Sequence, residues 1–308
     1  MTNRIVAIQG DYPSKLNPIT DSSIFLANEI QKKGYKIFYY EPKNLSIINS
    51  KVVANGFFIK FNYYERKFFK ILKKQKLNLN KCKFLLIRQN PPFNLEYISS
   101  TYILDTIKKK VRVINDPTSI RNISEKLYSV KYQKFMPSTI FTQNINEIKK
   151  FFKKNKKIII KPIHGFSGND IILLKKFNLD LVKKFIKKHN YIMCQKYLSK
   201  IYKGDKRVFI INGKVRGAIS RVPKKGSFLS NMSKGAKAIN INLTKKEIKI
   251  SKIIGKELKK ENIFFAGIDF IDQKLNGDIN VTSPTGLKTL NDLSKNNLAK
   301  IFWADLKA

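Results

Sequence analysis

A chain of 308 residues can bury a sizeable core in two or three domains without disulfide or metal support. Its 62 basic and 21 acidic residues give a formal net charge of +41, and no apolar run approaches the roughly 18 residues of a membrane span. The N-terminal segment also lacks a signal-peptide pattern, so we expect a cytoplasmic protein with no membrane partner.

The strong positive charge would suit a nucleic-acid-binding protein, because a basic surface releases phosphate counterions when it binds. Only eight of the 62 basic residues are arginine, however, and the lysines are scattered through every segment without a basic tail or interleaved aromatic residues. Such scatter is typical of solvated surfaces. We expect no specific nucleic-acid partner, although the charge should attract anionic substrates.

The first part of the chain alternates strand patterns with helix patterns. A strand is expected at residues 5–9, and Asp21-Ser-Ser23 then begins an amphipathic stretch that stops at Gly34. Further elements are expected as strands at 35–40, 84–87 and 111–114 and as a helix at 95–109. This alternation is typical of a parallel α/β sheet and predicts a domain over residues 1–120. No G-x-G-x-x-G follows the first strand, so a dinucleotide fingerprint is absent there.

Two further units are predicted, over residues 121–190 and 191–308. The first has the pattern of a small α+β domain, with helices from Ser124 and over 145–153, and strands over 139–141, 158–161 and 171–174. The strands expected in the second are 192–195, 207–211, 214–221, 264–271 and 278–281. Before the fourth of these strands come a polar loop, 223–235, and a helix with Ile248, Ile253, Ile254 and Leu258 on one side.

Two cysteines, Cys82 and Cys194, each lie in an apolar, strand-like segment. Such surroundings suit buried, reduced thiols better than a disulfide framework or a metal site. Neither cysteine is therefore expected to act in catalysis.

Hard oxygen ligands occur on two predicted strands near the C-terminus. Asp278 and Asn280 lie two residues apart, so on a strand they face the same side, and Asp269 on the preceding strand could join them. Magnesium prefers a few carboxylate oxygens together with substrate phosphates to a full protein cage. The segment therefore predicts a partial metal shell, with a hairpin of solvated acids as the alternative.

A lysine and two glycines form a candidate phosphate site. Lys161 ends a predicted strand, and Gly165 and Gly168 follow in the next loop. Lysine can neutralise phosphate oxygens, and glycine lets backbone N–H groups approach them closely. The spacing is not that of a P-loop, and a hairpin turn would look similar, so both interpretations stay open. His164 is expected to be a loop residue rather than a catalyst.

Arg207 is predicted to lie on a central strand, flanked by Val208 and Phe209. A buried arginine needs an anionic partner, and the guanidinium fork fits phosphate or carboxylate. The sequence is equally compatible with a bound ligand and with an internal salt bridge to Asp205.

Several motifs together carry a family resemblance. Lys126, the Lys161 loop, the segment Gly-Asp-Lys-Arg-Val at 204–208 and the block 267–285 follow the order and spacing of the ATP-grasp superfamily. Within it, the chain resembles bacterial glutathione synthetases over nearly its whole length. The segments that carry this narrower resemblance are IRQNPPF at 87–93, TYIL at 101–104, INDP at 114–117, EKL at 125–127 and INVTSPT at 279–285.

The resemblance implies an α/β fold with an N-terminal parallel-sheet domain followed by a two-part ATP-grasp fold. Residues 121–190 would form its small lid subdomain and residues 191–308 its large subdomain. The implied reaction joins glycine to γ-glutamylcysteine: ATP phosphorylates the carboxylate, and the amine attacks the acyl phosphate, with release of ADP and phosphate. Because water would destroy that intermediate, the loop 223–235 is a suitable mobile lid. The family also suggests a homotetramer.

The family implies a role for each motif residue. The nucleotide ATP would be contacted by Lys126, Lys161, Gly165, Ser167, Gly168, Gln195, Leu198 and, at the ribose, Asp205. Two magnesium ions, or Mn²⁺ in their place, would be held by Asp269, Asp278 and Asn280. The reacting carboxylate and its phosphate would face the catalytic residues Arg207 and Arg221. The substrates would also be contacted by Asn231, Ser283, Pro284 and Thr285.

Five positions depart from the family pattern. The family usually has arginine where Leu229, Lys237 and Lys288 align, glutamate at Asp278 and aspartate at Asn90. Loss of an arginine fork from the lid loop concerns contacts to substrate rather than the reaction class. Two alternatives therefore stay open: a ligase with another peptide or amino-acid acceptor, and a basic binding protein on a decayed ligase scaffold.

Overall fold

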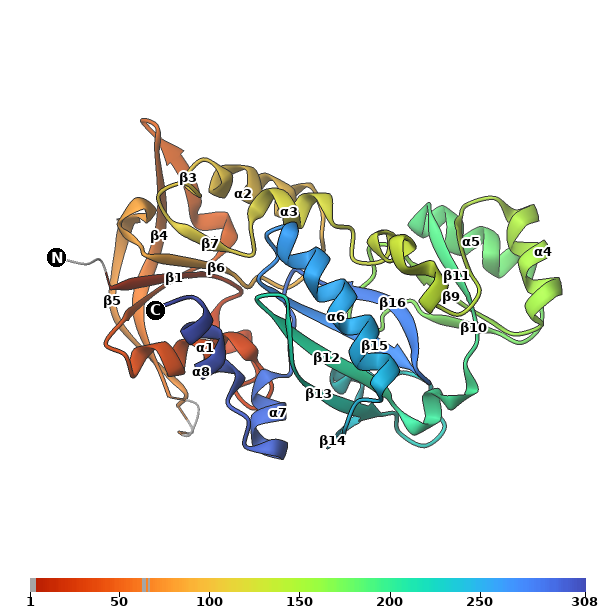
Figure 1. Cartoon of the computed structure of the whole chain (residues 1–308). Helices are drawn as coiled ribbons and strands as arrows, with labels where there is room; N and C mark the ends of the chain where they lie inside the picture. The colour runs from red at the N-terminus through yellow and green to blue at the C-terminus, as the bar shows by residue number, and fades with distance from the viewer. Residues whose placement is uncertain (1–3, 63–64, 66) are drawn as a thin grey trace.

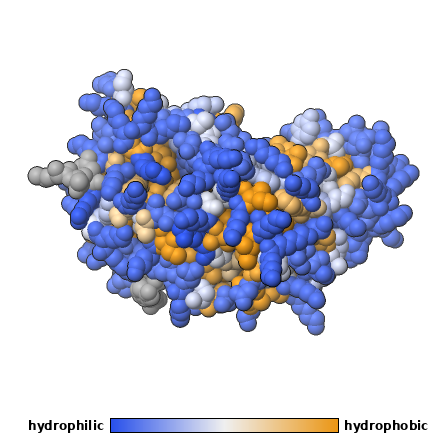
Figure 2. All heavy atoms as spheres, in the orientation of Figure 1, coloured by the Kyte–Doolittle hydropathy of each residue, from blue (hydrophilic) through white to orange (hydrophobic). Residues whose placement is uncertain are grey.

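The computed structural model describes residues 4–62, 65 and 67–308, and three β-sheets follow one another along this chain (Figure 1). The described helices include none that is long and apolar enough to cross a membrane. Hydrophilic side chains cover most of the face seen in Figure 2, as the scattered lysines predict. Within the described ranges, 3-10 helices connect the larger elements at Pro13–Lys15, Pro42–Asn44, Leu79–Lys81, Leu127–Phe135, Ser199–Lys203 and Met232–Lys234.

The first sheet has seven strands in the order β3-β4-β2-β1-β6-β7, and β5 pairs with β4. The strands are β1 (Ile5–Gln9), β2 (Lys36–Tyr40), β3 (Leu45–Ile48), β4 (Lys51–Phe61), β5 (Phe69–Asn78), β6 (Phe84–Ile87) and β7 (Arg112–Ile114). Its helices are α1 (Ser22–Gln31), α2 (Leu95–Asp105) and α3 (Pro117–Asn122). The strands β2, β1, β6 and β7 are parallel, which confirms the predicted α/β pattern. Asp21 caps α1 by accepting a hydrogen bond from the backbone of Ile24.

Three antiparallel strands, β3 to β5, extend this sheet and were not predicted from the sequence. In β4, Val52 and Ala54 pack into one core cluster, whereas Phe57 and Ile59 pack into another. The apolar alternation therefore changes phase near Gly56, and a strict period of two does not run through the strand. The partner strand β5 is rich in exposed lysines, which further hides the pattern.

The second sheet has four antiparallel strands in the order β10-β9-β11-β8. They are β8 (Thr139–Thr142), β9 (Ile158–Pro162), β10 (Ile172–Leu174) and β11 (Ile192–Lys196), with helices α4 (Ile145–Asn155) and α5 (Leu179–His189). Ile148 of α4 and Val182 of α5 are fully buried against the sheet. The helix expected from Ser124 is instead the 3-10 helix Leu127–Phe135, with non-helical backbone at Tyr132.

The third sheet has five strands in the order β14-β13-β12-β15-β16. They are β12 (Asp205–Ile211), β13 (Lys214–Val222), β14 (Lys237–Asn240), β15 (Phe265–Ile271) and β16 (Lys274–Asn280), all antiparallel to their neighbours. Helix α6 (Lys245–Lys260) covers this sheet, and α7 (Leu287–Ser294) and α8 (Leu298–Asp305) end the chain (Figure 1).

Helix α6 faces the sheet with a slightly different set of residues from that predicted. Ile250, Ile254 and Leu258 are buried, as their spacing of four residues requires. The expected core residue Ile253 is 39% exposed, because it lies about 100° around the helix from Ile254. A buried glutamate, Glu247, forms a capping box with Thr244 at the start of the helix.

The C-terminal helices return to the first sheet, so that sheet's core is built from both ends of the chain (Figure 1). Trp303 of α8 is fully buried and donates a hydrogen bond from Nε1 to the carbonyl oxygen of Leu26 in α1, at 2.9 Å. Its ring also packs edge-on against Phe84 of β6. These contacts hold α8 against α1 and the first sheet.

Asn115, at the end of β7, joins the first sheet to the third. Its Nδ2 donates to the carbonyl oxygens of Phe265 and Val281, at 2.8 and 2.6 Å. Its Oδ1 accepts from the backbone N–H groups of Phe264 and Phe265, at 2.9 and 2.8 Å. One buried side chain thus satisfies four backbone groups where the two sheets meet.

We expect Asn115→Ala to lower the free energy of unfolding by about 2–4 kcal/mol, because it leaves several buried backbone groups without partners. Urea unfolding followed by circular dichroism would measure the loss. Asn55→Ala, at an exposed position of β4, is the matched control. Equal stabilities of the two variants would contradict this role.

Candidate active site

A cavity of about 470 Å³ is lined by residues of all three sheets and their loops. Its size is typical of a site for a small molecule or cofactor. The first sheet contributes loop residues such as Asp21 and Asn90, the second contributes Lys161 and Gln195, and the third contributes most of the charged groups. The cavity contains 16 of the 17 predicted site residues, namely Lys126, Lys161, Gly165, Ser167, Gly168, Gln195, Leu198, Asp205, Arg207, Arg221, Asn231, Asp269, Asp278, Asn280, Ser283 and Thr285.

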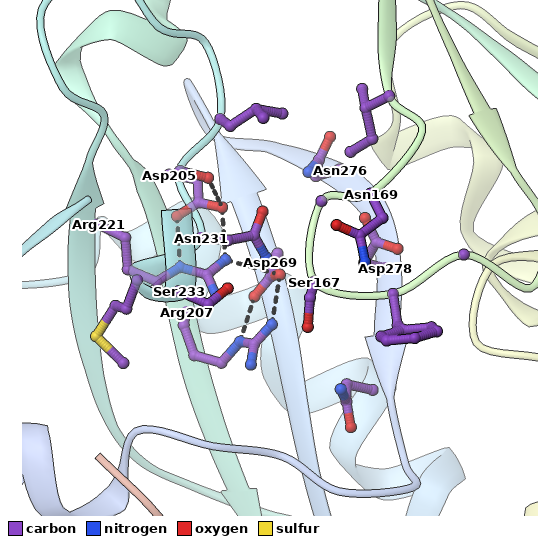
Figure 3. A pocket seen from close by; sticks show the side chains of 18 of the residues that line it. Ser167, Asn169, Asp205, Arg207, Arg221, Asn231, Ser233, Asp269, Asn276 and Asp278 are labelled. Atoms are coloured by element: carbon purple, nitrogen blue, oxygen red, sulfur yellow. Dashed lines mark hydrogen bonds and ion pairs between the residues drawn. The ribbon is translucent and has the colours of Figure 1, made fainter. Parts of the chain in front are cut away.

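Two arginines and two aspartates form a buried cluster on the third sheet (Figure 3). The strand register places Asp205 opposite Arg221 and Arg207 opposite Asp269. Arg207 donates to both oxygens of Asp269, at 2.6 and 2.8 Å, and Arg221 donates to both oxygens of Asp205, at 2.8 and 2.5 Å. A further bond of 2.9 Å from Arg221 to Asp269 joins the two pairs. We call these four residues the arginine cluster.

The charges of the arginine cluster stabilise one another. Burial alone would raise the pKa of Asp269, but Arg207 and Arg221 outweigh it and hold the pKa well below its usual range. Burial likewise raises the pKa of Asp205, with Arg221 opposing it. For Arg221, burial would lower the pKa, but Asp205 and Asp269 raise it above its usual value. The cavity therefore contains guanidinium groups that are charged and fixed in orientation before any ligand binds.

Two buried lysines lie across the cavity and share Asp278. Lys126 Nζ is 3.2 Å from one oxygen of Asp278, and Lys161 Nζ is 3.7 Å from the other. Burial lowers the pKa of Lys161, while Asp278 opposes that shift. Burial alone would raise the pKa of Asp278, but Lys126 and Lys161 lower it. Asp278 is thus the shared counterion of two buried lysines, whose ammonium groups suit a polyanionic ligand.

The predicted metal ligands do not converge into a complete shell. Among the residues that the structure describes, no group of three histidine, cysteine or acidic side chains could hold a metal ion. Asp269 is engaged by two arginines, and Asp278 by two lysines. Asn280 Oδ1, however, is buried without a hydrogen-bond partner. An orphaned amide oxygen beside a carboxylate on the same strand face fits a magnesium ion that takes its remaining ligands from phosphates and water.

The glycine-bearing loop after β9 lies over the lysines. Lys126 Nζ donates to the carbonyl oxygen of Gly165, at 2.8 Å, and so connects this loop to Asp278. Gly168 has a φ of +73°, and a Cβ there would lie 2.4 Å from Asn231 Oδ1. Position 168 therefore favours glycine for its backbone conformation, and any other residue there would have to displace the Asn231 side chain.

Three further residues that the sequence predicted for the site, Gln195, Ser283 and Pro284, each form hydrogen bonds within the protein. Gln195 is buried and connects Lys161 to Thr139, and Ser283 lines the cavity while donating to the carbonyl oxygen of Gln89. Pro284 is not among the residues that line the cavity. Its carbonyl oxygen instead accepts a hydrogen bond from Arg88, so it fixes the turn between Ser283 and Thr285.

The structure decides several alternatives that the sequence left open. Arg207 is in an internal salt bridge, but its partner is Asp269 rather than Asp205. The acids of the β15–β16 hairpin are not a solvated pair, since Asp269 is 4% exposed.

His164 is an exposed turn residue. Cys82 and Cys194 are free and buried, and burial raises the pKa of each thiol to about 12, as expected for inert thiols.

Sequence reasoning missed three residues of the site. Asn276 lines the cavity and accepts hydrogen bonds from Lys161 through Oδ1 and its carbonyl oxygen, at 3.0 and 3.2 Å. The alternation Asn276-Gly-Asp278-Ile-Asn280 could have revealed it. Glu125 accepts three hydrogen bonds from Val281 and Thr282, and Ser230 donates to Asp205. Neither of these long-range contacts has a signal in the local sequence.

Comparisons with known proteins agree with this geometry. Residues 5–121 match the model of the prokaryotic glutathione synthetase N-terminal domain, and residues 125–295 match that of the prokaryotic glutathione synthetase ATP-grasp domain. Glutathione synthetase of Bradyrhizobium diazoefficiens is 33% identical over 97% of this chain and 96% of its own length. That of Escherichia coli O157:H7 is 34% identical over 90% of each chain.

Solved structures show the same fold at low sequence identity. The D-cycloserine synthetase DcsG superposes with a TM-score of 0.68 at 11% identity, covering 98% of both chains. D-alanyl-alanine synthetase A from Vibrio cholerae superposes with a TM-score of 0.61 at 15% identity, covering 98% of this chain and 97% of its own. The chain has an ATP-grasp fold and belongs to the prokaryotic glutathione synthetase family.

Proposed function

We propose that the protein is a glutathione synthetase, an ATP-dependent ligase that joins glycine to γ-glutamylcysteine and releases ADP and phosphate. One observation supports the proposal. A chain of this family has one cavity lined by the arginine cluster, by Lys126 and Lys161, and by the polar residues of β16. The substrates would be small molecules. We propose a cytoplasmic location from the sequence pattern and a homotetramer from the family resemblance.

The proposed chemistry needs no side-chain nucleophile. A carboxylate is a poor electrophile, so transfer of the γ-phosphoryl group from ATP first converts it to an acyl phosphate. The amine then attacks the acyl carbon, and phosphate leaves. Both steps gather negative charge on oxygen, and Arg207 and Arg221 are charged donors held in place to stabilise it. We propose these two arginines as the catalytic residues.

The nucleotide would occupy the side of the cavity that contains the lysines. Lys126 and Lys161 would pair with its phosphates under the loop formed by Gly165, Ser167 and Gly168. The adenine would lie beside Gln195 and Leu198. A ribose contact from Asp205 is not favoured by the geometry, because both of its oxygens already accept hydrogen bonds from Arg221.

Magnesium would be held chiefly by Asp278 and Asn280, with Asp269 as a third ligand only if it leaves its arginine partners. Bound magnesium would neutralise phosphate charge during phosphoryl transfer. A pair of ions, and the preference for Mg²⁺ over Mn²⁺, are proposals from the family. Asn231, Ser283 and Thr285 line the substrate side of the cavity, and we propose them as substrate contacts.

One observation favours a second candidate, a ligase with a different amine acceptor. Leu229 lines the cavity with an apolar side chain where the family usually has arginine. Lys288, another departure, pairs with Asp292 on the same helix at 2.6 Å. At Leu229 the cavity therefore lacks a forked cation that the resemblance implies.

Omitting each reactant in turn tests the reaction. With Mg-ATP, γ-glutamylcysteine and glycine together, we expect phosphate release and an equal amount of glutathione, measured by a coupled phosphate assay and chromatography. Omission of either substrate should abolish product. Turnover with another amine but not with glycine would favour the second candidate, and no turnover with any acceptor would support a binding protein on a decayed scaffold.

Asp278→Asn should lower turnover by at least about a hundredfold, because it removes the charged oxygen ligand and unbalances two buried lysines. Circular dichroism should show that the fold is retained. Asp272→Asn is the matched control, since Asp272 lies on the turn of the same hairpin and pairs only with Lys200 among the described residues. Full activity of Asp278→Asn would refute the metal assignment.

The ion pairs of Asp278 predict that the cation and the nucleotide bind cooperatively. Without nucleotide, Asp278 is the counterion of Lys126 and Lys161, so Mn²⁺ alone should bind weakly. Phosphates would take over the lysines and free the carboxylate, so ADP should increase Mn²⁺ affinity by about tenfold or more. Electron paramagnetic resonance of free Mn²⁺ measures this once the Mn²⁺ bound by ADP in a protein-free titration is subtracted. Equal affinities with and without ADP would contradict the coupling.

A further inference from the structure

The loop between β13 and β14, residues 223–236, is held to the rest of the protein by few polar contacts. Phe228 to Ser233 line the cavity, so the loop forms one of its walls. Its lysines, Lys224, Lys225 and Lys234, form no salt bridge with any residue that the structure describes. The position of this loop must therefore depend on other contacts.

Ser230 provides the strongest of these contacts. Its Oγ–H donates to Asp205 Oδ2 at 2.6 Å, and its side chain is buried, with 8% of the residue exposed. A hydrogen bond to a buried carboxylate is stronger than one between neutral groups. The same oxygen of Asp205 accepts from Arg221 at 2.5 Å. One carboxylate oxygen thus connects the loop directly to the arginine cluster.

The next residue, Asn231, extends the connection to the second sheet (Figure 3). Its Oδ1 lies against Gly168, only 2.4 Å from where a Cβ of residue 168 would be. Ser230 and Asn231 therefore contact opposite walls of the cavity, one on β12 and the other on the glycine-bearing loop after β9. Met232 Sδ accepts a weak contact of 3.9 Å from Thr289 and adds little.

We propose that Ser230 is a positioning residue that anchors the 223–236 loop on the arginine cluster through Asp205, and so keeps water from the acyl phosphate. The proposal rests on the proposed function, because it assigns Ser230 a role in that same reaction. When the loop is displaced, a water oxygen attacks the acyl carbon and the bond from that carbon to the phosphate oxygen breaks. The products are the original carboxylate and inorganic phosphate, so ATP is consumed without a peptide bond.

The first test is the ratio of phosphate released to glutathione formed at saturating ATP, γ-glutamylcysteine and glycine. The wild-type ratio should be near one. Ser230→Ala should raise it to about two or more, because the loop opens more often once its charge-assisted hydrogen bond is lost. Ser230→Thr keeps the hydroxyl and should restore a ratio near one. A variant that is merely less stable would lower both products together and leave the ratio unchanged.

The second test is hydrogen exchange measured by mass spectrometry in the absence of any ligand. Ser230→Ala should exchange amides of residues 226–236 about tenfold faster than the wild type, and exchange should also rise in residues 165–170 because of the Asn231 contact. Ser227→Ala is the matched control, since among the described residues Ser227 Oγ bonds only within the loop, where it accepts from the N–H of Leu229. It should change neither the exchange rates nor the ratio.

The two tests separate this proposal from the proposed function. Unchanged exchange in Ser230→Ala overturns the anchor, and faster exchange with a ratio that stays near one overturns its protective role. If the wild-type protein forms no glutathione, the proposed function fails, whereas the exchange experiment still decides whether Ser230 anchors the loop.

Discussion

A buried charge is stable only beside an opposite charge. The antiparallel register of β13, β12 and β15 places two arginines opposite two aspartates on one face of the third sheet. Asp205 and Arg207 are two residues apart on β12, so both point into the cavity, and each meets an opposite charge on a neighbouring strand. Removing one member would leave an uncompensated buried charge, which costs about 3–5 kcal/mol. The rest of the site is arranged around this rigid group.

The second charged group differs from the arginine cluster in a way that suits ligand exchange. Lys126 and Lys161 lie 3.2 and 3.7 Å from Asp278, whereas the shortest contact of Arg207 with Asp269 is 2.6 Å. Lysine is also a point charge on a flexible stem, without the fixed fork of arginine. The arginines are therefore suited to orient reacting groups, and the lysines are suited to exchange an internal carboxylate for phosphate.

One departure from the family pattern, Leu229, lies in the 223–236 loop that forms a wall of the cavity. Leu229 offers no charge to a substrate, but the adjacent Ser230 bonds to the buried Asp205. The loop is thus connected to the arginine cluster through Asp205. Behind that wall, Asn115 and the C-terminal helices hold the first and third sheets together, so the cavity is shaped by rigid elements on its other sides.

Local patterns of apolar and polar residues in the sequence were enough to locate several strands and the start of α1. The strands at 5–9 and 84–87 have their predicted bounds, and α1 begins directly after Asp21, within the predicted amphipathic stretch. Asp278 and Asn280 face one side because the period of a strand is two, and the motif order identified the family. Tertiary structure alone decided which acid Arg207 pairs with, where β4 changes phase, and that Ser230 reaches Asp205. Those outcomes depend on strand register and on contacts between distant segments, which packing selects and local spacing does not encode.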